Sequence, residues 1–149
     1  MLIHRNGRFY VGRSSFALPN ECKLGRSPYE PAESGIVIRP IDDSCYIDIC
    51  FEDRADDAKL SLQGALSEYE CGKEVQPIEY PAGTAWCALY SDGHYNFFEV
   101  RADAPTGAQA NTGKDVNLFR ITVTAKADRD IEAIRKLPLI TELLNSFQP

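Results

Sequence analysis

The chain contains little of what an active site or a membrane segment usually needs. Its 149 residues include only two histidines, one tryptophan and one methionine. No stretch approaches the roughly 18 consecutive apolar residues of a membrane-spanning helix, and the first eight residues lack the apolar run of a signal peptide. We therefore expect a cytoplasmic protein without membrane insertion, unless a leader has been removed.

An excess of basic residues is also missing. The 16 Lys and Arg residues are scattered among 22 Asp and Glu residues, which gives a formal net charge of −6 at pH 7. Binding to nucleic acid or to an anionic membrane needs a concentrated basic surface. The charge therefore disfavours both as partners.

Metal-binding patterns are absent from the sequence too. The five cysteines are Cys22, Cys45, Cys50, Cys71 and Cys87. None of them forms the Cys-x₂-Cys spacing of a zinc site, and the acids between residues 42 and 57 do not follow the spacing of a calcium loop. We expect no metal and no cofactor, and at least one free thiol because the number of cysteines is odd.

The polar segment 102–117 is the only stretch that resembles a phosphate-binding loop. Five residues separate Gly107 from Gly113, and Lys114 is followed by Asp115, whereas that loop has four residues between its glycines and a Ser or Thr after the lysine. Nor is a nucleophile placed near a histidine, since strand geometry separates His94 from Cys87. The chain is therefore predicted not to be an enzyme, and Lys114 becomes a candidate contact for a partner.

Hydrophobic periodicity predicts a single α+β domain over residues 1–149. Strand-like alternation, turn pairs and one amphipathic period define the elements. They are a hairpin at 2–11, strands at 36–39, 45–52, 84–90, 94–100 and 118–125, and helices at 53–72 and from about Pro138 onward. Residues 20–35 are assigned to a connection. The expected fold is a mostly antiparallel sheet of about six or seven strands flanked by two main helices.

The hairpin centred on Asp92-Gly93 carries the candidate binding surface. A two-residue loop places Tyr90 opposite Tyr95. The same register puts four aromatic residues on one face: Trp86, Tyr90, Tyr95 and Phe97. Trp and Tyr are common at interaction hot spots, so this face is either an exposed recognition surface or a surface that a helix covers.

The strand at 45–52 has two chemically different faces. Cys45, Ile47, Ile49 and Phe51 share the apolar face, and Tyr46, Asp48, Cys50 and Glu52 share the polar one. The two thiols point to opposite sides and cannot bind one metal or each other. Cys45 is predicted to resist a thiol reagent, and Cys50 to be the one that reacts.

The order of elements and two short motifs resemble the PsbP and Mog-like superfamily of α/β/α sandwiches, including its DcrB and Eag-type bacterial members. The motifs are Phe-x-Leu-Pro and Leu-Leu-x-Ser-Phe, matched here by Phe16, Leu18, Pro19, Leu143, Leu144, Ser146 and Phe147. The resemblance implies structural roles for these residues and a fold used for binding proteins. Eag-type members are chaperones of secreted effectors and Mog-like members bind a small GTPase. We expect the chain to depart from the lipoprotein members in the leader and the lipid-accepting cysteine, so the class of partner stays open.

These observations favour a non-catalytic protein-binding module, of an adaptor or chaperone-like kind, whose partner is another protein. The partner would contact an exposed face of the sheet or segment 102–117. The alternative is a carrier with a ligand cavity between sheet and helix, lined by some of the four aromatic residues, and an enzyme of unrecognised type comes third. The oligomeric state is open, with a homodimer among the possibilities.

Overall fold

The computed structural model describes residues 3–5, 7–11, 14–19, 22–25, 35–40, 45–69, 74–104, 115–126, 128 and 138–148. Ten strands lie in these ranges: β1 (Ile3–Arg5), β2 (Arg8–Val11), β3 (Ser14–Ala17), β4 (Cys22–Gly25), β5 (Gly35–Pro40), β6 (Tyr46–Glu52), β7 (Gln76–Tyr80), β8 (Gly83–Ser91), β9 (Tyr95–Asp103) and β10 (Leu118–Lys126). The helices of the described part are α1 (Ala58–Leu66) and α3 (Pro138–Ser146).

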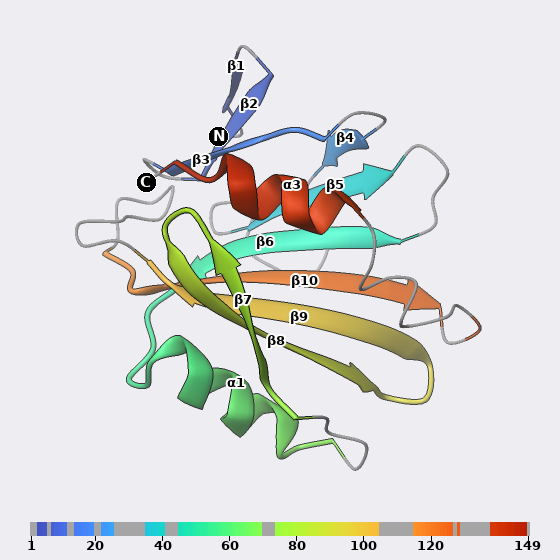
Figure 1. Ribbon diagram of the computed structural model, residues 1–149. Coiled ribbons are helices and arrows are strands. Elements are labelled where there is room, and N and C mark those ends of the chain that lie inside the picture. Colours follow the sequence, from blue (N-terminus) through green and yellow to red (C-terminus); the bar gives the residue numbers. More distant parts are fainter. Residues whose placement is uncertain are drawn as a thin grey trace.

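The strands form one large and one small antiparallel sheet. The large sheet has seven strands in the order β4-β5-β6-β10-β9-β8-β7, and the small sheet has the order β1-β2-β3. Figure 1 shows α1 on one side of the large sheet and α3 on the other. The predicted α+β architecture is therefore confirmed, with three strands that the sequence pattern did not reveal: β3, β7 and β4, the last of which lies within the segment assigned to a connection.

The β8–β9 hairpin forms at the predicted place with a different register. Tyr90 lies opposite Phe97 instead of Tyr95, and Ser91 lies opposite Asn96. The side chain of Asp92 accepts hydrogen bonds from the backbone N–H groups of residues 94 and 95, both at 2.8 Å, and these bonds lower its pKa. They move the turn centre one residue along, from Asp92-Gly93 to Gly93-His94, where Gly93 has a φ of 89°. Each residue of β8 therefore lies opposite a residue of β9 two positions further along than predicted. A shift by two residues leaves every side chain on its predicted face of the sheet.

Helix α1 is shorter than its hydrophobic pattern predicts. Asp57 is its N-cap, and its carboxylate accepts a hydrogen bond from the N–H of Leu60 at 2.9 Å. Only Ala58, Leu62 and Leu66 bury their side chains. The predicted cap at Gly72 lies outside the described residues. The amphipathic pattern thus predicted the buried face of the helix correctly, but it predicted a helix longer than Ala58–Leu66.

Most of the core lies between the sheet and α3. Cys45, just before β6, and Ile47 of β6 face this core as predicted, and Asp48 and Cys50 face the other way. Cys50 is nevertheless only 2% exposed, against 8% for Cys45. The expected difference in exposure is therefore absent, and burial gives Cys50 no reason to react faster. In strand β10 apolar and polar residues alternate, which is typical of a half-exposed strand, yet it is covered on much of both faces, since Thr124 is 5% exposed.

The two motifs that carry the PsbP-like resemblance meet in space. The rings of Phe16 and Phe147 lie 5.2 Å apart, and the hydroxyl of Ser146 accepts a hydrogen bond from the N–H of Ala17 at 2.9 Å. Arg8 donates to the carbonyl of Ser146, and β3 pairs with Gln148. These residues fasten the small sheet to the end of α3, which is a structural role.

Candidate functional site

The four aromatic residues share one face of the sheet, as predicted, and α1 packs against part of it. Leu62 and Leu66 of α1 form a second apolar cluster with Ala88 and Tyr90, and Trp86, Phe97 and Tyr69 pack around it. The ring of Tyr90 stacks on Phe97 at 4.9 Å and contacts Tyr69 at 4.6 Å. A helix therefore covers the centre of the candidate surface.

Exposure differs along this aromatic set. Tyr90 is 8% exposed, whereas Tyr95, at the end of the hairpin, is 43% exposed. Trp86 and Phe97 are partly buried, and the ammonium of Lys59 lies 4.7 Å from the centroid of the Trp86 ring. Lys114 lies outside the described residues. Of the four aromatic residues, three thus pack within the protein, and only Tyr95 exposes a large part of its side chain.

Charged residues occupy the same face beyond the aromatic cluster. Arg101 of β9 lies opposite both Trp86 of β8 and Arg120 of β10, and Glu99 lies opposite Thr122. Side chains two residues apart in a strand share a face, so these groups and Tyr90 all lie on the α1 side. Glu99 and Arg101 are 3% and 5% exposed. Buried ionised groups destabilise the fold unless they are paired and hydrogen-bonded. Glu99 and Arg101 therefore need paired, hydrogen-bonded partners on this face.

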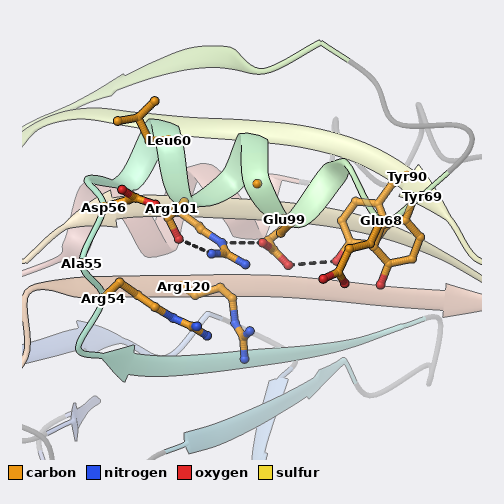
Figure 2. A pocket seen from close by; sticks show the side chains of 13 residues that line it. Arg54, Ala55, Asp56, Leu60, Glu68, Tyr69, Tyr90, Glu99, Arg101 and Arg120 are labelled. Atoms are coloured by element: carbon orange, nitrogen blue, oxygen red, sulfur yellow. Dashed lines mark hydrogen bonds and ion pairs between the residues drawn. The ribbon is translucent and has the colours of Figure 1, made fainter.

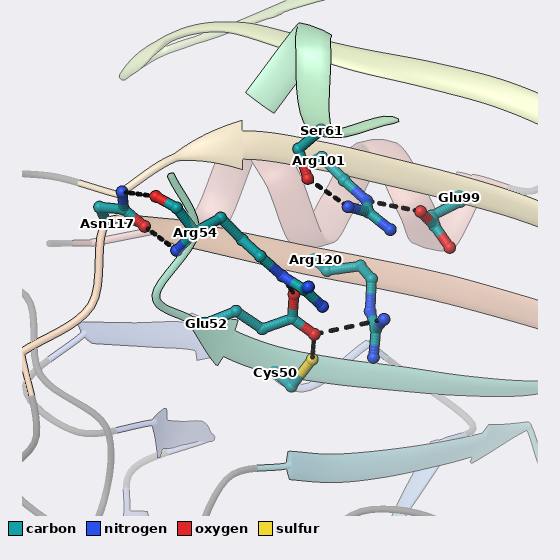
Figure 3. Close-up of polar contacts among 8 residues, drawn as sticks. All are labelled: Cys50, Glu52, Arg54, Ser61, Glu99, Arg101, Asn117 and Arg120. Carbon is teal, nitrogen blue, oxygen red and sulfur yellow. Dashed lines mark hydrogen bonds and ion pairs between the residues drawn. The ribbon is translucent and has the colours of Figure 1, made fainter. Parts of the chain in front are cut away.

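The first group of contacts links Tyr90, Glu99, Arg101 and Ser61. The hydroxyl of Tyr90 donates to one oxygen of Glu99 at 2.9 Å, and Nε of Arg101 donates to the other at 2.6 Å. A terminal nitrogen of Arg101 also donates to the hydroxyl of Ser61 on α1 (Figure 3). Both Glu99 oxygens are therefore engaged. Burial, followed by the charge of Glu99 and the bond to it, raises the pKa of the Tyr90 hydroxyl.

The second group is centred on Glu52 at the end of β6. Arg54 donates from Nε at 2.8 Å and Arg120 from a terminal nitrogen at 3.2 Å (Figure 3). The thiol of Cys50 donates to Glu52 at 3.6 Å. Burial alone would raise the pKa of Glu52, but the bond from Arg54 and the charge of Arg120 outweigh it, so the pKa is lowered.

A half-open cavity of about 570 Å³ lies between these two groups and α1. Its wall is contributed by Arg54, Ala55, Asp56, Leu60, Ser61, Gly64, Ala65, Glu68, Tyr69, Tyr90, Glu99, Arg101 and Arg120. In Figure 2 the guanidinium groups of Arg54 and Arg120 lie at one end, and Tyr69, Tyr90 and Glu68 lie at the other. The fold thus gathers residues from α1, its flanks, β8, β9 and β10 at one polar hollow.

Sequence reasoning selected only one residue of this cavity, Tyr90. A signal for the rest was present: Glu99 and Arg101 interrupt an apolar strand, and their alternation with Phe98 and Val100 puts them on one face. Charges on a face that a helix covers point to a buried polar cluster. Arg54 has no such signal, because its place beside Glu52 depends on how the chain leaves β6.

Within the part of the chain that the structure describes, no group of three or more His, Cys, Asp or Glu side chains is arranged to hold a metal ion. No helix in that part is long and apolar enough to cross a membrane.

Comparison with known proteins supports the fold class. No family model and no curated protein matches the chain. Its architecture is PsbP-like, an antiparallel sheet with a helix on each face. The solution structure of cyanobacterial PsbP (CyanoP) from Synechocystis sp. PCC 6803 is similar over 91% of this chain and 85% of that one, with a TM-score of 0.55 and 10% sequence identity. At this identity the likeness shows the fold alone.

Proposed function

We propose that this chain is a non-catalytic binding module of PsbP-like fold and that its partner, another protein, docks at the cavity beside α1. The observation that carries the proposal is the half-open cavity itself, about 570 Å³ in volume and lined by charged side chains from several elements. Concave sites with a few convergent polar groups are where proteins most often bind other molecules.

The state of the ionisable groups supports binding over catalysis. A general acid or base works best when its pKa lies near the operating pH. Here the pKa of Glu52 is lowered and that of Tyr90 is raised, so both move away from neutrality. The oxygens of Glu52 and Glu99 are also occupied by arginine, tyrosine and cysteine donors. Groups held in this way can orient a ligand but exchange protons poorly.

The rim of the cavity supports a protein as the partner. Leu60 is 53% exposed on α1 and lines the cavity between charged residues, among them Asp56 and Glu68. An apolar contact inside a polar border is the usual composition of a protein interface. A protruding side chain of a partner would fill the hollow while its surroundings contact α1.

A pull-down from the source organism with matched variants tests this proposal. The purified protein, Leu60→Asp and Lys126→Gln serve as baits, because Lys126 is an exposed residue outside the cavity. We expect a protein that the unchanged bait and Lys126→Gln retain and that Leu60→Asp loses. Equal retention by all three baits would remove the cavity as the docking site, and measured turnover of a substrate would remove the non-catalytic role.

The second candidate, a small-ligand carrier, is favoured by the size of the cavity. Small-molecule pockets have volumes of about 300–1,000 Å³, and the value here lies within this range. Native mass spectrometry of the protein purified from its source distinguishes the two candidates. A bound small molecule that is lost on Arg101→Leu would favour the carrier.

A further inference from the structure

We infer that the cavity beside α1 binds a carboxylate group through the guanidinium groups of Arg54, Arg101 and Arg120. The inference rests on the proposed role of this cavity as a binding site, and it names the chemistry that the site recognises. The three arginines come from separate parts of the chain, the segment after β6, strand β9 and strand β10, and all three line the same hollow.

The placement of the arginines is unfavourable without acidic groups. Arg101 and Arg120 lie directly opposite one another on neighbouring strands, and like charges at such positions repel. Glu99 engages Arg101, and Glu52 is shared by Arg54 and Arg120. Both carboxylates therefore serve to hold the guanidinium groups in place at the cavity wall.

The donors of two of these arginines are only partly used in the described part of the chain. A guanidinium carries five N–H donors. Arg54 gives Nε to Glu52, and Arg101 gives Nε to Glu99 and one terminal nitrogen to Ser61. Arg101 is 5% exposed, so the cavity is where its other N–H groups can meet water or a ligand. A carboxylate accepts two parallel N–H bonds from a guanidinium, which suits this position.

The acids of the cavity do not offer an equivalent site for a cation. Glu99 has both oxygens engaged, and Asp56 and Glu68 are exposed, where water and salt weaken their charges. These two acids would repel a ligand with several negative charges more than one with a single charge. The arrangement therefore suits one carboxylate.

The opposite end of the cavity suits a flat or apolar neighbour of that carboxylate. Tyr69 lies there, packed against Tyr90 with ring centroids 4.6 Å apart (Figure 2). Aromatic rings favour offset or edge contacts with another ring. The recognised group is thus a carboxylate next to an aromatic or apolar moiety, supplied by a small organic acid or by an acidic residue of a partner.

NMR titration of the ¹⁵N-labelled protein with matched probes tests the inference. Phenylacetate and the neutral phenylacetamide form one pair, and the blocked dipeptides acetyl-Asp-Phe-amide and acetyl-Asn-Phe-amide form the other. We expect an acidic probe to shift the Arg Nε–H signals and the amide of Tyr69 at concentrations where its neutral partner does not. Arg54→Gln should weaken this binding at least fivefold, and Lys126→Gln should leave it unchanged.

The arms of the titration separate the sources of the carboxylate. Saturation by phenylacetate favours a small acid, and saturation by the Asp dipeptide alone favours a partner protein. Equal shifts with acidic and neutral probes, or none with any probe, would overturn the carboxylate inference. The docking proposal would survive that result if Leu60→Asp loses the captured protein while Arg54→Gln retains it, which keeps the two failures distinguishable.

Discussion

In the described part of the chain, one helix packs on each face of the seven-stranded sheet, yet the two faces differ in chemistry. On the α3 side, Phe16, Phe119 and Phe147 pack ring against ring within an apolar cluster. On the α1 side, the buried residues include Glu99 and Arg101. Glu99 accepts a hydrogen bond from the hydroxyl of Tyr90, and Arg101 donates one to the hydroxyl of Ser61. One face has the composition of a folding core, and the other combines packing with a buried ionic network.

The position of the helices explains this difference. Helix α1 packs mainly on β8 and β9, and the same face of the sheet continues beyond them onto β10 and the end of β6. Arg120 of β10 lines the cavity there, and Glu52 at the end of β6 binds Arg120. The position of α1 over β8 and β9 therefore leaves space for binding beside it, while the opposite face supplies the apolar burial on which stability depends.

The largest effect is expected on the α3 face. Phe119 is fully buried and contacts the rings of Phe16, Phe51, Tyr80 and Phe147. Replacing it with alanine leaves a cavity, and such changes cost about 4 kcal/mol. Urea unfolding followed by circular dichroism measures the loss. Phe119→Leu, which keeps most of the volume, should cost clearly less, and equal losses in both variants would contradict the packing.

The next effect tests the ionic network of the α1 face. Glu99→Gln leaves the buried guanidinium of Arg101 without its carboxylate, and breaking a buried ion pair costs about 3 kcal/mol. The double variant Glu99→Met with Arg101→Met should recover much of this loss, because no buried charge remains. The same urea measurement applies. If the double variant were less stable than Glu99→Gln, the pair would stabilise the fold itself and the contrast between the faces would fail.

The sequence predicted the sheet and its two faces because both follow from local periodicity. Alternation in β6 and β10 assigned each side chain to its face, and Pro138 marked the start of α3. The register of the hairpin was wrong, because it depends on the Asp92 side chain, which competes for backbone donors near the turn. Strand β7 was not predicted, because Pro77 and Glu79 are unusual residues for a strand and the segment becomes a strand only by pairing with β8.

The candidate site was less predictable than the fold. Tyr90 was selected for its aromatic character. In the structure its hydroxyl donates a hydrogen bond to Glu99, and its side chain lines the cavity. Arg54, Arg101 and Arg120 converge from positions up to 66 residues apart, and pairing of β10 with both β9 and β6 brings them together. Such convergence depends on strand order, which no local pattern in the sequence contains.

A smaller effect is expected at the start of α1, which forms the wall of the cavity. Asp57→Ala removes the carboxylate that accepts the N–H of Leu60, and losing such a cap costs about 1 kcal/mol. Urea unfolding measures the change, and Asp57→Ser is the control because serine can cap the same N–H. If serine were as damaging as alanine, the cap would not be the source of the loss.

The smallest effect is the acid sensitivity of Glu52 at the edge of the α1 face. Its pKa is lowered from the ordinary value of 4.5, since the bond from Arg54 and the charge of Arg120 outweigh its burial. Folded Glu52 therefore binds its proton less readily than the unfolded chain does, so its contribution to stability is present above about pH 4.5 and is lost as the pH falls through the lowered pKa. Urea midpoints between pH 7 and pH 3 should fall less steeply in Glu52→Gln than in the unchanged protein. Glu68→Gln, which removes an exposed acid from the same cavity, should keep the original slope, and a matching change in both variants would show that net charge and not the Glu52 contacts sets the acid response.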